Sequence, residues 1–227
     1  MRSQFPLPLL ALLLIAQSAV SSSQAVSGLR IIEQRDQVST VRFEQNADTE
    51  LVYASTINPL YLAAVTYCLR GHGKDYFTTR LPAAGNQTLA EVAEPLLRRS
   101  SNEALINLRK IICAEGSHAT GDSQYAADYV QAYLDRIPGV GSATKLTYST
   151  RAKLAAPNDA TPGFTSTLKA LQTGYRFIFN PANTKVTGLT PAIIANMLQD
   201  MGENYKMLPQ FEVKPALANM AQVATIS

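Results

Sequence analysis

Residues 58–71 read NPLYLAAVTYCLRG and form the best-marked helix of the sequence. Asn58 is a residue type that caps helices, Pro59 fits the first helical position, and Gly71 is suited to the C-terminus. Four residues recur on one face of this helix, at the spacing of a buried stripe: Tyr61, Ala64, Val65 and Cys68. The pattern predicts a helix that packs into the core and turns Cys68 inward.

Strand and helix patterns are mixed on both sides of this helix. Residues 29–43 carry β-branched residues at alternating positions and predict two short strands or one bent strand. The run YRFIF at residues 175–179 predicts the strongest strand of the chain. Thr88-x-x-Glu91 is a capping box, which predicts a helix start. Because no regular strand–helix–strand alternation is present, we predict an α+β fold with mixed short strands and about five helices, arranged as one main layer of helices on a small sheet.

One polar stretch divides the chain. Residues 155–163 (AAPNDATPG) combine two prolines with Asn, Asp and Gly, and predict an exposed loop or linker. It separates a main α+β region, residues 26–154, from a C-terminal strand–helix region, residues 164–227. We expect the two regions to pack on the same domain, since about 200 residues suit one domain or two small ones.

The first 25 residues predict a signal peptide, residues 1–25. Arg2 supplies a positive charge, residues 7–16 (LPLLALLLIA) are almost unbroken apolar sequence, and small and polar residues follow. The apolar run is about half as long as a helix that crosses a bilayer. We therefore expect cleavage after Ala19 or Ala25 and export to the periplasm or out of the cell, with no transmembrane span left in the cleaved protein.

Composition and charge exclude several classes of protein. Hydrophobic residues make up 46% and charged residues 16% of the chain, which is typical of a folded globular protein. The net charge of +3 comes from scattered Lys and Arg, without the basic cluster that binds nucleic acid. No nucleotide-binding or metal-binding motif is present, so we expect neither a cofactor nor a metal, and no nucleic-acid partner.

The sequence has two cysteines, Cys68 and Cys113, both in apolar surroundings. In an oxidising compartment an even pair of cysteines favours one disulfide, which we predict here. The bond would close a loop of about 45 residues and stabilise the fold by roughly 3–4 kcal/mol in the chain-entropy model. The alternative is two separate buried thiols, because a free cysteine packs as a small apolar residue.

The two histidines lie in predicted loops, where functional residues concentrate. His72 precedes Asp75 by three residues, and His118 precedes Asp122 by four. Together with Ser117 these residues are candidates for a Ser–His–Asp hydrolase site, although the GxSxG motif of many hydrolases is absent. The alternative is that both histidines are polar loop residues without a chemical role.

A row of tyrosines follows on the helix predicted after Asp122. Tyr125, Tyr129 and Tyr133 are four residues apart and share one helix face. Tyrosine is favoured at protein interfaces, so this tyrosine stripe is a candidate partner-binding surface. Half-buried packing within the chain is the alternative.

Predicted export without a catalytic signature favours a non-enzymatic role. We expect an exported interaction or assembly component of the cell envelope or extracellular space, such as part of a secretion, pilus or surface complex. Its partners would be other envelope or extracellular proteins. Two alternatives stay open. An exported hydrolase would place a loop histidine beside an acid and a serine in a pocket, whereas a small-ligand carrier would enclose an apolar cavity.

Overall fold

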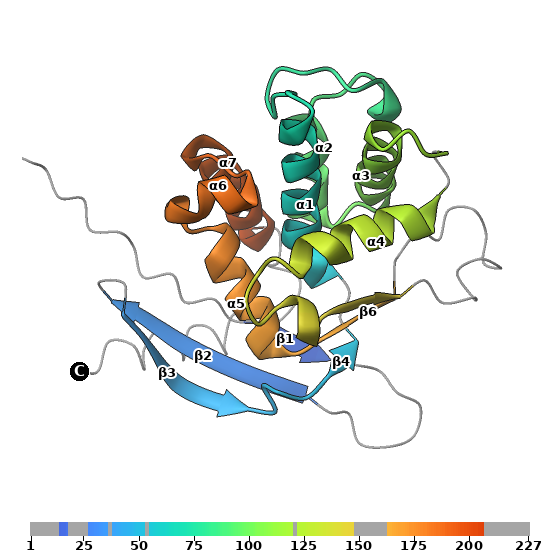
Figure 1. Ribbon diagram of the computed structural model, residues 1–227. Helices are drawn as coiled ribbons and strands as arrows, with labels where there is room; N and C mark the ends of the chain where they lie inside the picture. The colour runs from blue at the N-terminus through green and yellow to red at the C-terminus, as the bar shows by residue number, and fades with distance from the viewer. Residues whose placement is uncertain are drawn as a thin grey trace, which may run out of the picture.

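The computed structural model covers the 227-residue chain and has an α+β fold, as the sequence predicted. A body of helices stands above strands that lie along one side of the molecule (Figure 1). The described residues form seven α-helices and two small sheets, where we expected about five helices and one sheet. The structure describes the following residues: 14–17, 27–35, 38–52, 55–119, 122–147 and 163–206.

The first sheet has the strand order β1–β2–β3, with each strand antiparallel to the next. Its strands are β1 (Leu14–Gln17), β2 (Ser27–Arg35) and β3 (Val38–Gln45), and a β-bulge interrupts the β2–β3 register at Ile31/Ile32. β2 and β3 confirm the two strands predicted for this region. β1 lies inside the stretch predicted as a signal peptide, so cleavage would remove this edge strand from β2.

The second sheet joins strands that are far apart in the sequence. Its order is β4–β6–β5, all antiparallel: β4 (Leu51–Val52), β6 (Gly163–Ser166) and β5 (Lys145–Thr147). Residues 155–162 of the predicted linker lie outside the described residues. Gly163, the last residue of the predicted linker, is instead the first residue of β6. β6 pairs with β4 and β5, which precede the linker, so chain segments from both sides of the linker share one sheet.

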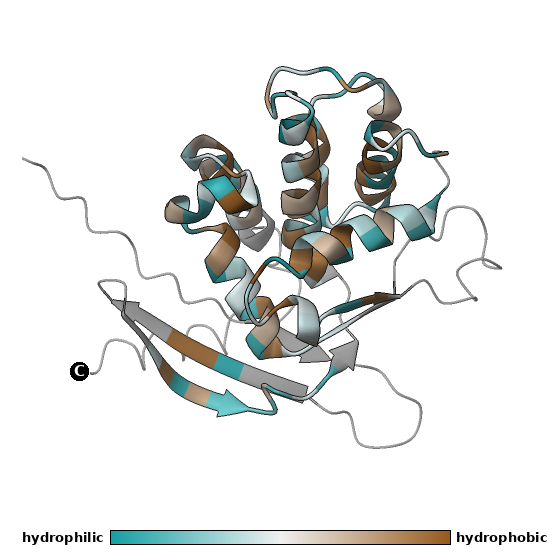
Figure 2. Ribbon diagram, viewed as in Figure 1, coloured by the Kyte–Doolittle hydropathy of each residue, from teal (hydrophilic) through white to brown (hydrophobic). Residues whose placement is uncertain are grey.

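Helix α1 (Asn58–Gly71) is the centre of the helical body. Its bounds match the prediction, but the N-cap is Ile57, at the end of the 3-10 turn η1 (Ser55–Ile57), rather than Asn58. Eleven of its fourteen residues are buried, so the burial extends well beyond one stripe. The helix contacts α2, α3, α4, α5 and α6, and Figure 2 shows largely apolar colouring along it.

The described part of the chain has six further α-helices: five of them contact α1, and α7 packs on α2. Two of their starts follow the predicted caps: Thr88 Oγ1 accepts from the Glu91 N–H in a capping box, and the Asp122 carboxylate accepts from the Tyr125 N–H. None of the described helices is both long and apolar enough to cross a membrane. The helices are α2 (Leu89–Arg99), α3 (Asn102–Glu115), α4 (Ser123–Leu134), α5 (Leu168–Ile178), α6 (Thr184–Thr187) and α7 (Pro191–Lys206), with 3-10 turns η2 (Pro82–Ala84), η3 (Gly141–Ala143) and η4 (Pro181–Asn183).

The strand predicted for residues 175–179 is wrong, because this segment ends helix α5. Thr167 caps the helix, with its hydroxyl accepting from the Ala170 N–H at 3.1 Å. Residues recur on the buried face at helical spacing: Leu168, Leu171, Tyr175 and Ile178. Burial of this face against the core therefore overrides the local strand preference of YRFIF.

Gly141→Ala is expected to lower the free energy of unfolding by about 2–3 kcal/mol. A Cβ on Gly141 would lie 2.4 Å from the Asp135 Cα, and the turn after α4 has to move to make room for it. Urea unfolding of the purified protein measures the change.

Gly202→Ala is the matched control for this substitution. Nothing lies within 4 Å of the added Cβ, and alanine is the better helix former, so α7 is expected to gain up to about 1 kcal/mol. Similar effects of the two substitutions would contradict the close packing at Gly141.

Candidate functional site

A pocket of about 410 Å³ lies at the C-terminal end of α1 and gathers several of the residues singled out in the sequence. Cys68, His72 and Tyr129 are among its lining residues. The other lining residues come from the end of α1 and from α6 with the glycine that follows it: Tyr67, Arg70, Gly71, Thr184, Lys185 and Gly188.

His72 at the rim of this pocket faces a glutamate. Its Nδ1 lies 3.9 Å from the Glu115 carboxylate, which also pairs with Lys74. Asp75 instead accepts hydrogen bonds from the Thr78 hydroxyl and from the N–H groups of Phe77 and Thr78, and these bonds hold the pKa of Asp75 below its ordinary value. In the part of the chain that the structure describes, the predicted His72–Asp75 pair is therefore not formed.

His118 does pair with Asp122, as its spacing predicted. Its Nδ1 lies 3.5 Å from the Asp122 carboxylate, and its ring stacks on Tyr125 with centroids 3.6 Å apart. Ser117 is exposed and has a left-handed backbone, with φ 59°, but no hydrogen bond joins it to His118 among the described residues. These candidates do not form a Ser–His–Asp arrangement in the described structure, and they lie outside the lining of the pocket. The described residues also contain no cluster of three metal-ligating side chains.

The predicted Cys68–Cys113 disulfide is not present, because both residues are buried free thiols. The Cys113 thiol donates to the Asp122 carbonyl at 3.2 Å, and the Cys68 thiol hydrogen-bonds with Tyr129. Helices α1 and α3 each turn a cysteine toward α4, where each thiol has its own partner. Burial raises the pKa of both thiols.

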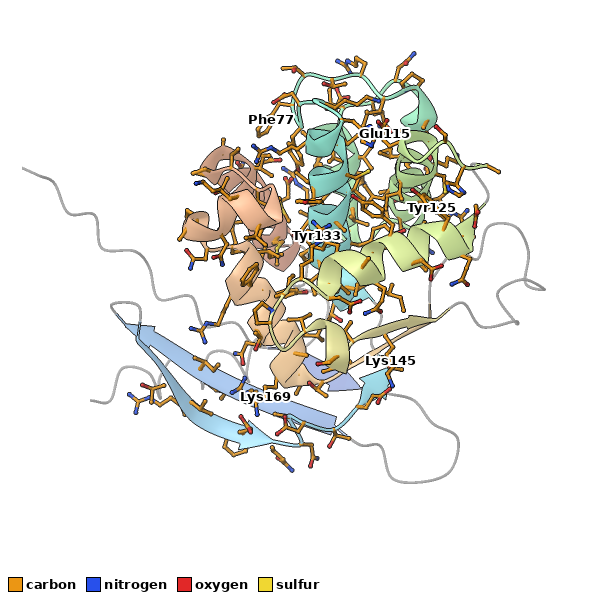
Figure 3. All side chains as sticks on the ribbon, in the orientation of Figure 1. Phe77, Glu115, Tyr125, Tyr133, Lys145 and Lys169 are labelled. Atoms are coloured by element: carbon orange, nitrogen blue, oxygen red, sulfur yellow. The ribbon has the colours of Figure 1, made fainter. Side chains whose placement is uncertain are left out.

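Of the tyrosine stripe of α4, Tyr133 is buried, whereas Tyr125 and Tyr129 are half-buried. Tyr133 is 3% exposed, its ring centroid lies 5.7 Å from that of Tyr67, and its hydroxyl donates to the Thr187 carbonyl at 3.4 Å. Burial raises the pKa of Tyr129 and of Tyr133. Figure 3 labels Tyr133 on α4.

The N-terminal member of the stripe is also occupied within the chain. Tyr125 lies so close over Gly116 that a Cβ added there would be 2.0 Å from its Oη. It also stacks on His118. All three tyrosines therefore have contacts within the chain, as in the half-buried packing that the sequence left open. The most exposed large apolar side chains lie elsewhere.

Two of these side chains lie on the β2–β3 hairpin. Val41 and Phe43 of β3 are 46% and 44% exposed, and the register places Phe43 opposite the half-buried Ile31 of β2. β3 is the last strand of its sheet, and no described strand pairs with its outer side. Alternation along the sequence predicted these strands, but it did not indicate which of their apolar residues stay uncovered.

Arg30 fastens this hairpin to the helical body. Its Nε lies 2.6 Å from the Glu44 carboxylate, and its Nη1 donates to the Gln172 side-chain oxygen at 2.8 Å. Gln172 is buried on α5. The two bonds join β2, β3 and α5, so one guanidinium links the hairpin to α5 in addition to the packing of α5 on β2.

Comparison with known proteins yields no family: no protein-family model matches the chain, and no curated protein matches it. The role of this protein is therefore inferred from its own surfaces.

Two reactive thiols per chain are expected only after unfolding. Because burial raises the pKa of Cys68 and Cys113, little thiolate forms in the native protein at about pH 8. Titration with a thiol reagent, in the absence of reductant, measures this before and after denaturation. Denatured, unreduced protein with no titratable thiol would mean that the two cysteines are disulfide-bonded after all.

Tyr133→Ala is expected to destabilise the protein by about 3 kcal/mol, since it empties a buried site and removes the bond to the Thr187 carbonyl. Thermal unfolding measures the loss. Val186→Ala, at a residue that is 44% exposed, is the control and should leave stability within about 0.5 kcal/mol. If Tyr133→Ala unfolded at the same temperature as the unmodified protein, the packing of Tyr133 in the core would be contradicted, and the stripe would again be a candidate partner-binding surface.

Proposed function

We propose that this protein is an exported, non-enzymatic interaction component of the cell envelope or extracellular space, which binds a partner protein through the β2–β3 hairpin. The observation that carries the proposal is the exposure of Val41 and Phe43 on β3, the outermost strand of the first sheet. Export rests on the signal-peptide pattern of residues 1–25.

An edge strand with exposed apolar side chains is a template for another strand. Burying Val41 and Phe43 would stabilise a complex by about 25 cal/mol for each Å² of apolar surface removed from water. Main-chain groups on the outer side of β3 would supply hydrogen bonds to the added strand. The register pairs Phe43 with Ile31 and Val41 with Ile32, so the bulge turns the two exposed side chains to opposite faces of the sheet. The partner is therefore an extended segment of another exported protein, with apolar side chains on both of its faces, one beside Val41 and one beside Phe43.

Charged residues alternate with the two apolar residues along β3. Arg42 and Glu44 flank Phe43 in the sequence, and Glu44 is held by Arg30. Charges on an edge strand limit unspecific pairing between copies of a protein. The β-bulge at Ile31/Ile32 adds a local twist, which further restricts the strands that fit.

The opposite edge of the sheet supports the same reading. Residues Leu14–Gln17 pair antiparallel with β2, with Leu14 opposite Arg30 and Gln17 opposite Ser27. These residues belong to the predicted signal peptide, whose cleavage would leave this edge of β2 without its strand. A sheet that accepts a short, largely apolar strand from its own leader has the chemistry to accept one from a partner.

Site-specific photo-crosslinking in the source organism tests this function. A photoreactive phenylalanine analogue replaces Phe43 in one strain and Phe77 in another. The two phenylalanines are similarly exposed, at 44% and 41%, but Phe77 follows α1 at the opposite end of the molecule (Figure 3). We expect one discrete adduct from position 43, identified by mass spectrometry, and none from position 77.

Binding to the purified partner then tests the apolar contact itself. Val41→Ser is expected to weaken binding by about fivefold, because part of a buried apolar contact is lost. Val186→Ser, at a valine of nearly equal exposure on α6, should leave the affinity unchanged. Equal adducts from positions 43 and 77, no adduct from position 43, or full affinity of Val41→Ser would refute the hairpin as the docking surface.

A further inference from the structure

The charge of the pocket at the end of α1 is entirely basic. Arg70, His72 and Lys185 line it, and no Asp or Glu is among the described residues that do. Arg136 is not a lining residue but lies next to one, with its guanidinium carbon 4.7 Å from the ring centroid of Tyr67. A cleft lined by one sign of charge concentrates ions of the opposite sign.

The protein does not neutralise most of these cations itself. Glu115 pairs with Lys74, and its carboxylate lies 3.9 Å from the His72 Nδ1. Of the basic residues that line the pocket, it therefore contacts His72 alone. Within the described part of the chain, no carboxylate pairs with Arg70, Lys185 or Arg136. The three groups are therefore left to attract an external anion.

Close packing between two distant segments holds these cations in place. The Arg70 Nη1 donates to the Gly188 carbonyl at 2.7 Å, across 118 positions of sequence. Gly188 has φ 76°, and a Cβ there would lie 3.1 Å from the Tyr67 Cα, which shows how closely the end of α6 approaches α1. The bond orients the Arg70 guanidinium and leaves its other N–H donors available to a ligand.

Two aromatic rings belong to the same pocket. Tyr67 packs against Tyr133 and carries Arg136 on its face, and the Tyr129 hydroxyl is tied to Cys68. These contacts give both rings fixed positions. A pocket of about 410 Å³ is large enough for a small organic molecule, not only for a bare ion.

We propose that this pocket binds a small organic anion that carries a planar ring. Its carboxylate, sulfonate or phosphate group lies between Arg70 and Lys185, which offer several N–H donors and two positive charges. Its ring packs against Tyr129 and against the part of Tyr67 that Arg136 and Tyr133 leave uncovered. This binding site is separate from the β2–β3 hairpin and holds whether or not the hairpin binds a partner.

A matched pair of fluorescent probes tests the charge requirement. 8-Anilinonaphthalene-1-sulfonate carries the anionic group on a planar ring system, and N-phenyl-1-naphthylamine has the same rings without the sulfonate. We expect the full chain without its leader to bind the sulfonate more tightly than the neutral probe. Added salt should weaken the binding of the sulfonate alone.

Substitution of one lysine tests the location. Lys185→Gln is expected to weaken the binding of the sulfonate by about fivefold and to leave that of the neutral probe unchanged. Lys145→Gln is the control, because Lys145 on β5 is exposed like Lys185 but does not line the pocket. Val41→Ser alters the apolar hairpin. Both variants should bind the sulfonate as the unmodified protein does. Lys185→Arg should restore binding, which separates a role of the charge from damage to the fold.

Three outcomes would overturn the proposal. They are equal affinity for the two probes, an unchanged affinity of Lys185→Gln for the sulfonate, and no binding of the sulfonate up to about 1 mM. Loss of binding in Val41→Ser but not in Lys185→Gln would assign the probe to the hairpin instead and would equally refute the pocket.

Discussion

Burial of helix α1 on all sides is the constraint on which the rest of this structure depends. Five other helices pack on it, and the full burial of Ala63 and Ala64 lets their backbones approach closely. Both candidate surfaces are tied to this helix. The end of α6 approaches α1 closely at Gly188, and this places Lys185 at the pocket. Helix α5 also packs on α1, and its Gln172 accepts a hydrogen bond from Arg30 of the hairpin. The position of α1 constrains the positions of the elements packed on it, because a dense core leaves little empty space for side chains to rearrange.

Hydrogen bonds satisfy several of the polar groups that this packing buries. The Tyr175 hydroxyl donates to the Thr56 carbonyl, the Tyr133 hydroxyl to the Thr187 carbonyl, and the Thr144 and Ser166 hydroxyls share a bond of 2.8 Å. Each bond links segments that are distant in the sequence. An unpaired buried polar group costs about 1–3 kcal/mol, so these links also select one arrangement of the helices over its alternatives.

The two proposed surfaces differ in chemistry as well as in place. The hairpin exposes apolar side chains on a strand edge, which suits a protein segment, whereas the pocket presents cations between aromatic rings, which suits a small anion. They lie on different elements: β3 carries the first, and α1, α4 and α6 form the second. Neither surface uses the pairing of His118 with Asp122, which holds together the start of α4.

Helix starts and caps depend on residues that are close in the sequence, and they could be predicted from it. Burial and pairing of side chains depend on residues that are distant in the sequence, and they could not. The bounds of α1, the capping box at Thr88 and the Asp122 cap depend on contacts within about one turn, so local patterns were sufficient. Tertiary contacts decided that YRFIF is helical and that Tyr133 of the tyrosine stripe is buried. They also gave the two thiols separate partners, Tyr129 for Cys68 and the Asp122 carbonyl for Cys113. The same contacts brought Lys185 and Arg70 to the lining of one pocket and left Phe43 exposed. Whether a side chain is buried, paired or exposed depends on which element packs over it, and that element comes from elsewhere in the chain.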